Sequence, residues 1–171
     1  MAMERHDHPS ILVLGVGNIL FSDEGVGIRV IEAIQDRYSF PAHVTVQDGG
    51  TLGVHLLGTI SHVDYLIVVD VIRNEGEPGS LYRIAGEEIP KRIFAKNSLH
   101  DVDFLEALTL CEALDGPPKT VIVGVEPLDI ETVSIDLTPL IREKIDPLIE
   151  MVLAELEALG VRPKTDAERI A

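Results

Sequence analysis

The chain has 171 residues, 46% of them hydrophobic, which is long enough for one domain with a full core. It carries 29 acidic residues against 14 Lys and Arg, and the resulting net charge of -15 disfavours nucleic acid and anionic membranes as partners, because phosphate binding relies on basic side chains. The single cysteine, Cys111, excludes an intrachain disulfide framework and is compatible with a reducing cytoplasm, so we expect no disulfide-linked partner.

The segments outside the expected core are polar. Residues 1–9 contain no apolar run of the kind that a secretory signal requires, and no stretch approaches the ~20 apolar residues of a membrane span. We therefore predict a cytoplasmic protein with a single domain, whose core covers about residues 10–160. A polar leader, 1–9, and a loosely held polar tail, 161–171, are expected to flank this core.

Segments of strand and helix character alternate along the chain. Short apolar runs predict buried strands, whereas apolar residues recurring every three or four positions predict helices. The expected strands are 11–14, 44–47, 65–70, 81–84 and 120–125, and the expected helices are 26–38, 51–60, about 101–114 and a broken last helix within 138–160. The strand at 81–84 follows turn residues and is expected at an edge. This alternation predicts a three-layer α/β/α fold with a mostly parallel, twisted sheet of about five strands, flanked by helices.

The loop between the first strand and the first helix has the sequence Gly15-Val-Gly-Asn-Ile-Leu-Phe-Ser-Asp-Glu-Gly25. It begins as a nucleotide-binding turn does, but Leu20 stands where the dinucleotide fingerprint requires its third glycine. Asp23 and Glu24 then lie at or just before the helix N-terminus, where a pyrophosphate would bind. Two carboxylates there would repel a phosphate and favour a cation. A Rossmann-like nucleotide-binding module stays open as an alternative, with this loop against it.

Three side chains are expected to meet at the carboxyl edge of the sheet. Glu24 follows the first strand and Asp70 ends the third, and these two strands are neighbours in a sheet whose order begins second, first, third. His100, at the start of a later helix, could close the site over them. Two carboxylates and an imidazole suit a borderline divalent ion such as zinc, manganese or nickel. The alternative for Asp70 is a cap on the following turn.

The motif Asp48-Gly49-Gly50 is expected to end the second strand in a turn. Glycine leaves no side chain in the way, so a substrate backbone could approach closely at Gly49 and Gly50. An ordinary strand-ending turn is the equal alternative to substrate binding. Motifs of other chemistries, such as HExxH, GxSxG, GxxxxGK[ST] and paired CxxC, do not occur in the sequence.

Residues 11–25 closely resemble the N-terminal signature of the [NiFe]-hydrogenase maturation proteases. The resemblance continues through 48–51, 66–70, 78–79 and 123–127 and covers roughly residues 11–160. It implies a cytoplasmic endopeptidase that removes a C-terminal extension from the hydrogenase large-subunit precursor after nickel insertion.

Carried over residue by residue, the resemblance assigns the metal-binding and catalytic roles to Glu24, Asp70 and His100. Nickel would be supplied by the precursor, and other divalent ions could occupy the same site. The choice between a metallo- and an aspartic-type protease stays open. A nickel-reading maturation chaperone without hydrolysis, which would use the same ligands, is the second alternative.

Overall fold

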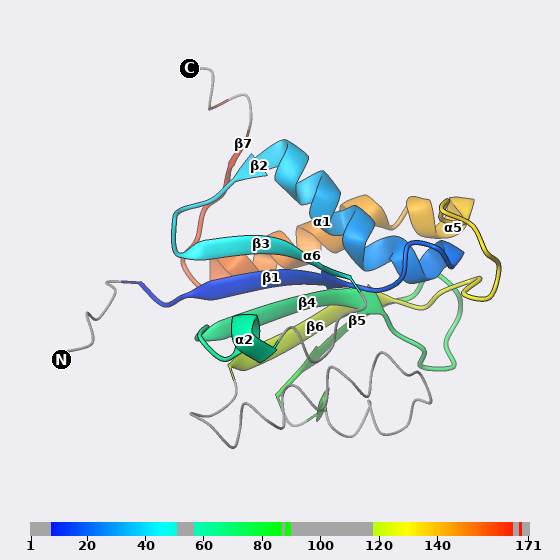
Figure 1. Cartoon of the computed structure of the whole chain (residues 1–171), viewed down its shortest axis with the longest axis horizontal. Coiled ribbons are helices and arrows are strands. Elements are labelled where there is room, and N and C mark those ends of the chain that lie inside the picture. Colours follow the sequence, from blue (N-terminus) through cyan, green and yellow to red (C-terminus); the bar gives the residue numbers. More distant parts are fainter. Residues whose placement is uncertain (1–7, 51–56, 87, 90–117, 166–167, 169–171) are drawn as a thin grey trace.

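The computed structural model of the chain describes residues 8–50, 57–86, 88–89, 118–165 and 168. Its main sheet has five strands in the order β3-β1-β4-β6-β5 (Figure 1). These strands are β1 (Ile11–Val16), β3 (Val44–Gly50), β4 (Tyr65–Val71), β5 (Leu81–Ala85) and β6 (Lys119–Val125). All neighbouring pairs are parallel except β5 with β6. The predicted fold class, the order of the first three strands and the edge position of 81–84 are therefore confirmed.

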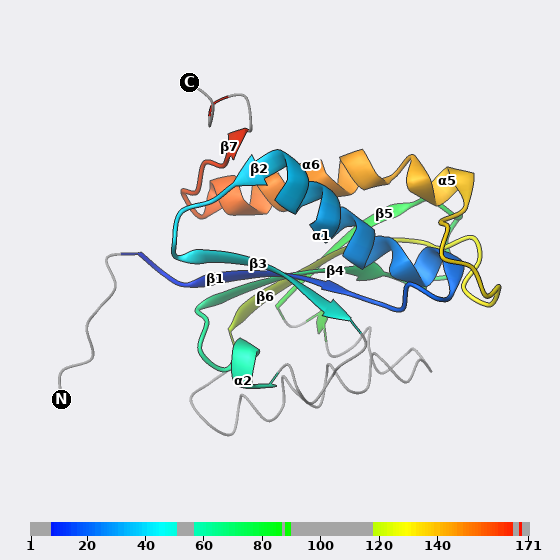
Figure 2. The same cartoon turned by 45° about the horizontal axis from the view of Figure 1, so that its top comes forward.

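Helices cover both faces of this sheet (Figure 2). The helices α1 (Val26–Arg37) and α6 (Ile145–Ala158) lie on one face, with the short α5 (Pro139–Arg142) preceding α6. The helix α2 (Leu57–Ile60) lies on the other face. The last helix is broken as predicted, into α5 and α6.

Strand β1 lies between two apolar layers, and all six of its residues are therefore buried. Ile11 and Val13 pack with α1 and α6, whereas Leu12 and Leu14 belong to the layer that includes Ile60 of α2. Successive side chains of a strand point to opposite faces, so a run without polar residues suits a strand covered on both sides. The sequence pattern and the layered packing agree here.

One pairing near the end of the chain was not predicted. The segment β7 (Lys164–Thr165) pairs antiparallel with β2 (Tyr38–Ser39), which directly follows α1. Val161, just after α6, is buried in the core. The first residues of the expected polar tail thus contact the folded domain. Two-residue strands carry too little hydrophobic pattern to be recognised in a sequence.

Helix α1 lies unusually close to the sheet at Gly27. A Cβ at this position would be 2.3 Å from the carbonyl oxygen of Val69 and 2.4 Å from that of Val16. Close helix–strand packing is the role of the third glycine in a dinucleotide fingerprint. Here Gly27 has that role, whereas the fingerprint would place the glycine at position 20. The loop between β1 and α1 is therefore longer than in a dinucleotide-binding turn. This contact sets the start of α1 directly over the ends of β1 and β4.

Substituting Gly27→Ala is expected to lower the free energy of unfolding by about 3 kcal/mol, because two backbone oxygens would have to move. The matched control is Gly58→Ala in α2, where an added Cβ meets nothing within 4 Å. This control should be neutral or slightly stabilising, by up to about 1 kcal/mol. Urea denaturation followed by circular dichroism measures both variants. Equal midpoints for the two would contradict the close-packing argument.

Candidate active site

Glu24 and Asp70 lie at the carboxyl edge of the sheet, where the sequence places them. Glu24 belongs to the 3-10 turn η1 (Ser22–Gly25), and Asp70 is the penultimate residue of β4. Gly17 lies close to both residues. An added Cβ on Gly17 would be 1.9 Å from the carbonyl oxygen of Glu24 and 3.9 Å from Oδ1 of Asp70. Only a glycine, with its φ of 141°, lets η1 fold back against β4. Both acidic residues are half-buried.

Asp70 is held by its own backbone. Its Oδ1 accepts a hydrogen bond of 2.7 Å from the N–H of Val71. The donor Val71 is the last residue of β4, so this bond lies within the strand and not in the turn after it, and it holds the direction of the carboxylate. A fixed carboxylate at a sheet edge is suited to holding a cation or moving a proton.

The motif Asp48-Gly49-Gly50 differs from the prediction because it continues β3 instead of ending it. Pairing shifts there, so that Gly15 lies opposite Asp48 and Val16 opposite Gly50. The bulged Gly49 is buried, and an added Cβ would be 2.8 Å from the side chain of Leu14. Close packing of β3 on β1 thus explains Gly49 without a substrate. Gly50 reaches the site, since its carbonyl accepts a hydrogen bond from Gly17.

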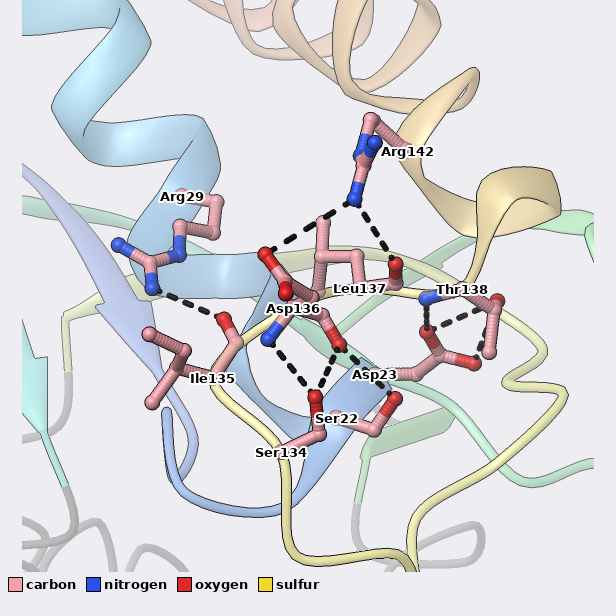
Figure 3. A network of polar contacts seen from close by, with 9 residues as sticks. All are labelled: Ser22, Asp23, Arg29, Ser134, Ile135, Asp136, Leu137, Thr138 and Arg142. Atoms are coloured by element: carbon pink, nitrogen blue, oxygen red, sulfur yellow. Dashed lines mark hydrogen bonds and ion pairs between the residues drawn. The ribbon is translucent and has the colours of Figure 1, made fainter.

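Asp23 does not face the site, contrary to the expectation that it would favour a cation beside Glu24. Its side chain is fully buried and accepts hydrogen bonds from the N–H groups of Leu128, Asp129 and Thr138, at 2.8–3.0 Å. The hydroxyl of Thr138 donates to both of its oxygens (Figure 3). Asp23 therefore anchors the segment 126–138, which follows β6, to η1. Of the two adjacent acids, Glu24 is therefore the candidate for a role in catalysis or metal binding.

The loop after β1 does not offer its backbone to a phosphate. A phosphate-binding loop presents several N–H groups to its ligand. In this loop, N–H groups of seven residues donate to oxygens of the protein itself: Gly17, Asn18, Leu20, Phe21, Ser22, Asp23 and Glu24. This hydrogen bonding, together with the position of Glu24, weighs against the nucleotide-binding alternative.

Glu126 is a buried acid that sequence reasoning missed. It accepts a hydrogen bond of 2.9 Å from the Tyr82 hydroxyl and another of 2.9 Å from the N–H of Asn74, in the loop that follows β4. Burial, and then the hydrogen bond to Glu126, raises the pKa of Tyr82, so the phenol stays protonated and continues to donate. Glu126 thus fixes the loop that leaves Asp70. Its position directly after a buried strand, like that of Asp70, was the available signal.

The third predicted residue, His100, lies outside the described residues, as does Cys111. Within the described ranges, no three His, Cys, Asp or Glu side chains are grouped so that they could hold a metal ion. The described part of the candidate site therefore consists of Glu24 and Asp70 around Gly17. In the same part of the chain, no helix is long and apolar enough to cross a membrane.

Comparison with known proteins agrees with this geometry. A family model described as hydrogenase maturation protease (HycI) matches residues 28–155. The hydrogenase 2 maturation protease of Escherichia coli K12 is 40% identical over 153 residues, covering 88% of this chain and 93% of that protein. The hydrogenase expression/formation protein HupD of Thiocapsa roseopersicina is 39% identical over 155 residues, covering 90% and 70%. The solved structure of the hydrogenase maturating endopeptidase HybD from E. coli superposes with a TM-score of 0.88 at 39% identity, covering 92% of this chain and 98% of that one.

Together with the α/β/α architecture, these matches define the class of protein as a hydrolytic enzyme, an endopeptidase. The sequence resemblance is confirmed by these matches. The chain belongs to the hydrogenase maturation protease family, and its role is that of an endopeptidase in hydrogenase maturation.

Proposed function

We propose that this endopeptidase removes the C-terminal extension of a [NiFe]-hydrogenase large-subunit precursor, in the cytoplasm, after nickel has been inserted. The observation that carries the proposal is that the Glu24 backbone and the Asp70 carboxylate both lie within 4 Å of the position that a Cβ on Gly17 would take. A protein substrate that carries its own metal would meet both acids at this open edge of the sheet. Gly50, hydrogen-bonded to Gly17, borders the same edge and, with the exposed Asp48, is the proposed contact for the substrate backbone, whereas Gly49 is buried against Leu14.

Nickel fits the donor set as part of the substrate. Glu24 and Asp70 supply carboxylate oxygens, His100 would add an imidazole nitrogen, and such mixed sets bind borderline divalent ions. By binding to these three residues, nickel held by the precursor would place the scissile bond next to them. Binding would then depend on completed insertion, which ties cleavage to the state of the substrate. Other divalent ions could take the same ligands.

Hydrolysis needs one group to take a proton and later return it. In the proposed reaction Asp70 or Glu24 accepts a proton from water while the water oxygen adds to the scissile carbonyl carbon. The same proton then passes to the leaving amide nitrogen as the C–N bond breaks. Atoms and charges balance without a covalent enzyme intermediate. The metallo- and aspartic-type descriptions differ only in whether nickel polarises the carbonyl during this step.

The test is an incubation of the purified protein with two forms of the precursor, nickel-loaded and nickel-free, followed by mass spectrometry of the large subunit. We expect a shortened large subunit from the nickel-loaded form and an unchanged one from the nickel-free form. Equal cleavage of both forms would contradict the nickel dependence. An unchanged length of both would instead favour the nickel-reading chaperone.

A further inference from the structure

Exposed apolar side chains gather on the two loops beside the candidate site. The described residues include six exposed large hydrophobic side chains, and five of them lie on the loop after β1 or on the segment after β6. We name these five the apolar rim: Ile19, Leu20, Leu128, Val133 and Ile135. Leu20 is 54% exposed, Ile135 62% and Val133 77%. Exposed apolar groups that cluster in this way mark interaction surfaces more often than scattered ones do.

Backbone contacts join the two loops into one surface. Phe21 and Ser134 form a parallel bridge, in which Ser134 donates to the carbonyl of Leu20 at 3.0 Å and Ser22 donates to the carbonyl of Ser134 at 2.8 Å. Leu20 and Val133 directly precede the two bridged residues, so the bridge holds the backbones of these two rim residues next to each other. The rim therefore has a fixed shape.

Further polar contacts hold the rim from behind. Arg29 of α1 donates to the carbonyl of Ile135 at 3.1 Å (Figure 3). Asp23 accepts a hydrogen bond from the N–H of Leu128. A surface that is ordered before it binds loses little conformational entropy on binding. A rim held in one conformation by these contacts is therefore better suited to docking than an apolar loop without them.

Two carboxylates near the rim already accept hydrogen bonds from the protein. Asp129 accepts hydrogen bonds from the N–H groups of Glu131 and Thr132 and from the Thr132 hydroxyl. The Thr132 contacts, above all, hold the pKa of Asp129 below its ordinary value. Asp23 is buried. A partner could therefore cover the rim without leaving these two carboxylates unpaired, although the chain as a whole is strongly acidic.

We infer that the apolar rim is the docking surface for an apolar patch on the folded body of the large-subunit precursor, beside the point where its extension leaves that body. This inference rests on the proposed function. Continuity with the site carries it: Ser22, whose N–H donates to the carbonyl of Ser134, belongs to the same turn as Glu24. A folded protein whose extension reaches Glu24 must lie over one of the surfaces next to η1, and among the residues that the structure describes the rim is the apolar one. Contacts away from the scissile bond then determine which protein is cleaved.

The test uses Leu20→Ser and Val133→Ser, separately and together, with Leu81→Ser as the matched control. Leu81 is also an exposed leucine, at 39%, but lies on edge strand β5, three strands away from β1. Burial of one large apolar side chain corresponds to a factor of about ten or more in affinity. We expect each rim variant to raise the KM for the nickel-loaded precursor, and its Kd in direct binding, about tenfold, with kcat within about twofold. Leu81→Ser should leave all three constants unchanged.

The outcomes separate this inference from the proposed function. If the wild-type protein binds the precursor without shortening it, the proposed function fails, while weaker binding by the rim variants still supports the docking surface. Unchanged Kd and KM in the double variant, with an unchanged melting temperature, would overturn the inference. So would a rim-dependent dimer in sedimentation with precursor binding unaltered, because the rim would then be covered by a second copy.

Discussion

Replacing Asp70 with Asn is expected to abolish processing of the nickel-loaded precursor. The expected loss in kcat/KM is about a hundredfold to ten-thousandfold. An amide neither accepts the proton of water nor contributes a charged oxygen to a cation. The fold should stay intact, because the amide oxygen can still accept the hydrogen bond that Asp70 receives from Val71. The change in the free energy of unfolding should stay within about 1 kcal/mol. Single-turnover cleavage assays and urea denaturation measure the two quantities.

The matched control for this substitution is Asp36→Asn. Asp36 is an exposed acid in α1, so its replacement removes the same charge without touching the carboxyl edge of the sheet. Processing by this variant should equal that of the wild type within about twofold. Complete cleavage by the Asp70→Asn protein would contradict a direct role of this carboxylate. A parallel loss in both variants would instead point to the overall charge of the enzyme.

The part of the fold that positions Asp70 could be predicted from local patterns. The apolar runs at 11–14 and 65–70 are long enough to mark buried strands, and alternation with helices specifies parallel pairing. Once β1 and β4 are neighbours, the carboxyl ends of both strands must lie at one edge. Glu24 and Asp70 could therefore be placed together before their contacts were known.

Other features depended on partners that are far away in sequence. Asp23 is held by Leu128 and Thr138, which follow it by 105 and 115 residues, and no periodicity reports such a contact. Two adjacent acids look alike in a sequence, although Asp23 is fully buried and Glu24 is half-buried. The continuation of β3 through Asp48-Gly49-Gly50 was missed because glycines usually end strands. A bulge against β1 is the exception that accommodates them.

The geometry of the site therefore depends on residues that take no part in the chemistry. Gly17 and Gly27 allow the backbone of η1 and α1 to lie directly on β1 and β4. Asp23 then joins η1 to the segment after β6. The position of Glu24 is therefore held by two contacts of η1, one with the sheet and one with the segment after β6. Loss of either should displace Glu24 from Asp70 even though both acids are still present.

Substituting Asp23→Ala is expected to cause a large loss of stability, about 3–5 kcal/mol in the free energy of unfolding. The substitution leaves three part-buried N–H groups, of Leu128, Asp129 and Thr138, without their acceptor, and each unsatisfied donor costs about 1 kcal/mol or more. For a chain of this length the melting temperature should fall by roughly 10 °C. Processing should fall as well, since η1 and the apolar rim lose their common anchor. Differential scanning calorimetry and the cleavage assay measure the two effects.

Two controls separate the anchoring role of Asp23 from its charge. Asp136→Ala removes an acid from the same segment, but that side chain is 79% exposed and pairs only with Arg142 at 4.0 Å, so less than about 0.5 kcal/mol should be lost. Thr138→Val removes the hydroxyl donor and keeps the backbone N–H, and should cost about 1 kcal/mol. The expected order of destabilisation is therefore Asp23→Ala, Thr138→Val, Asp136→Ala. A melting temperature of Asp23→Ala close to that of Asp136→Ala would show that the segment after β6 is held by other contacts, and that Glu24 does not depend on this anchor.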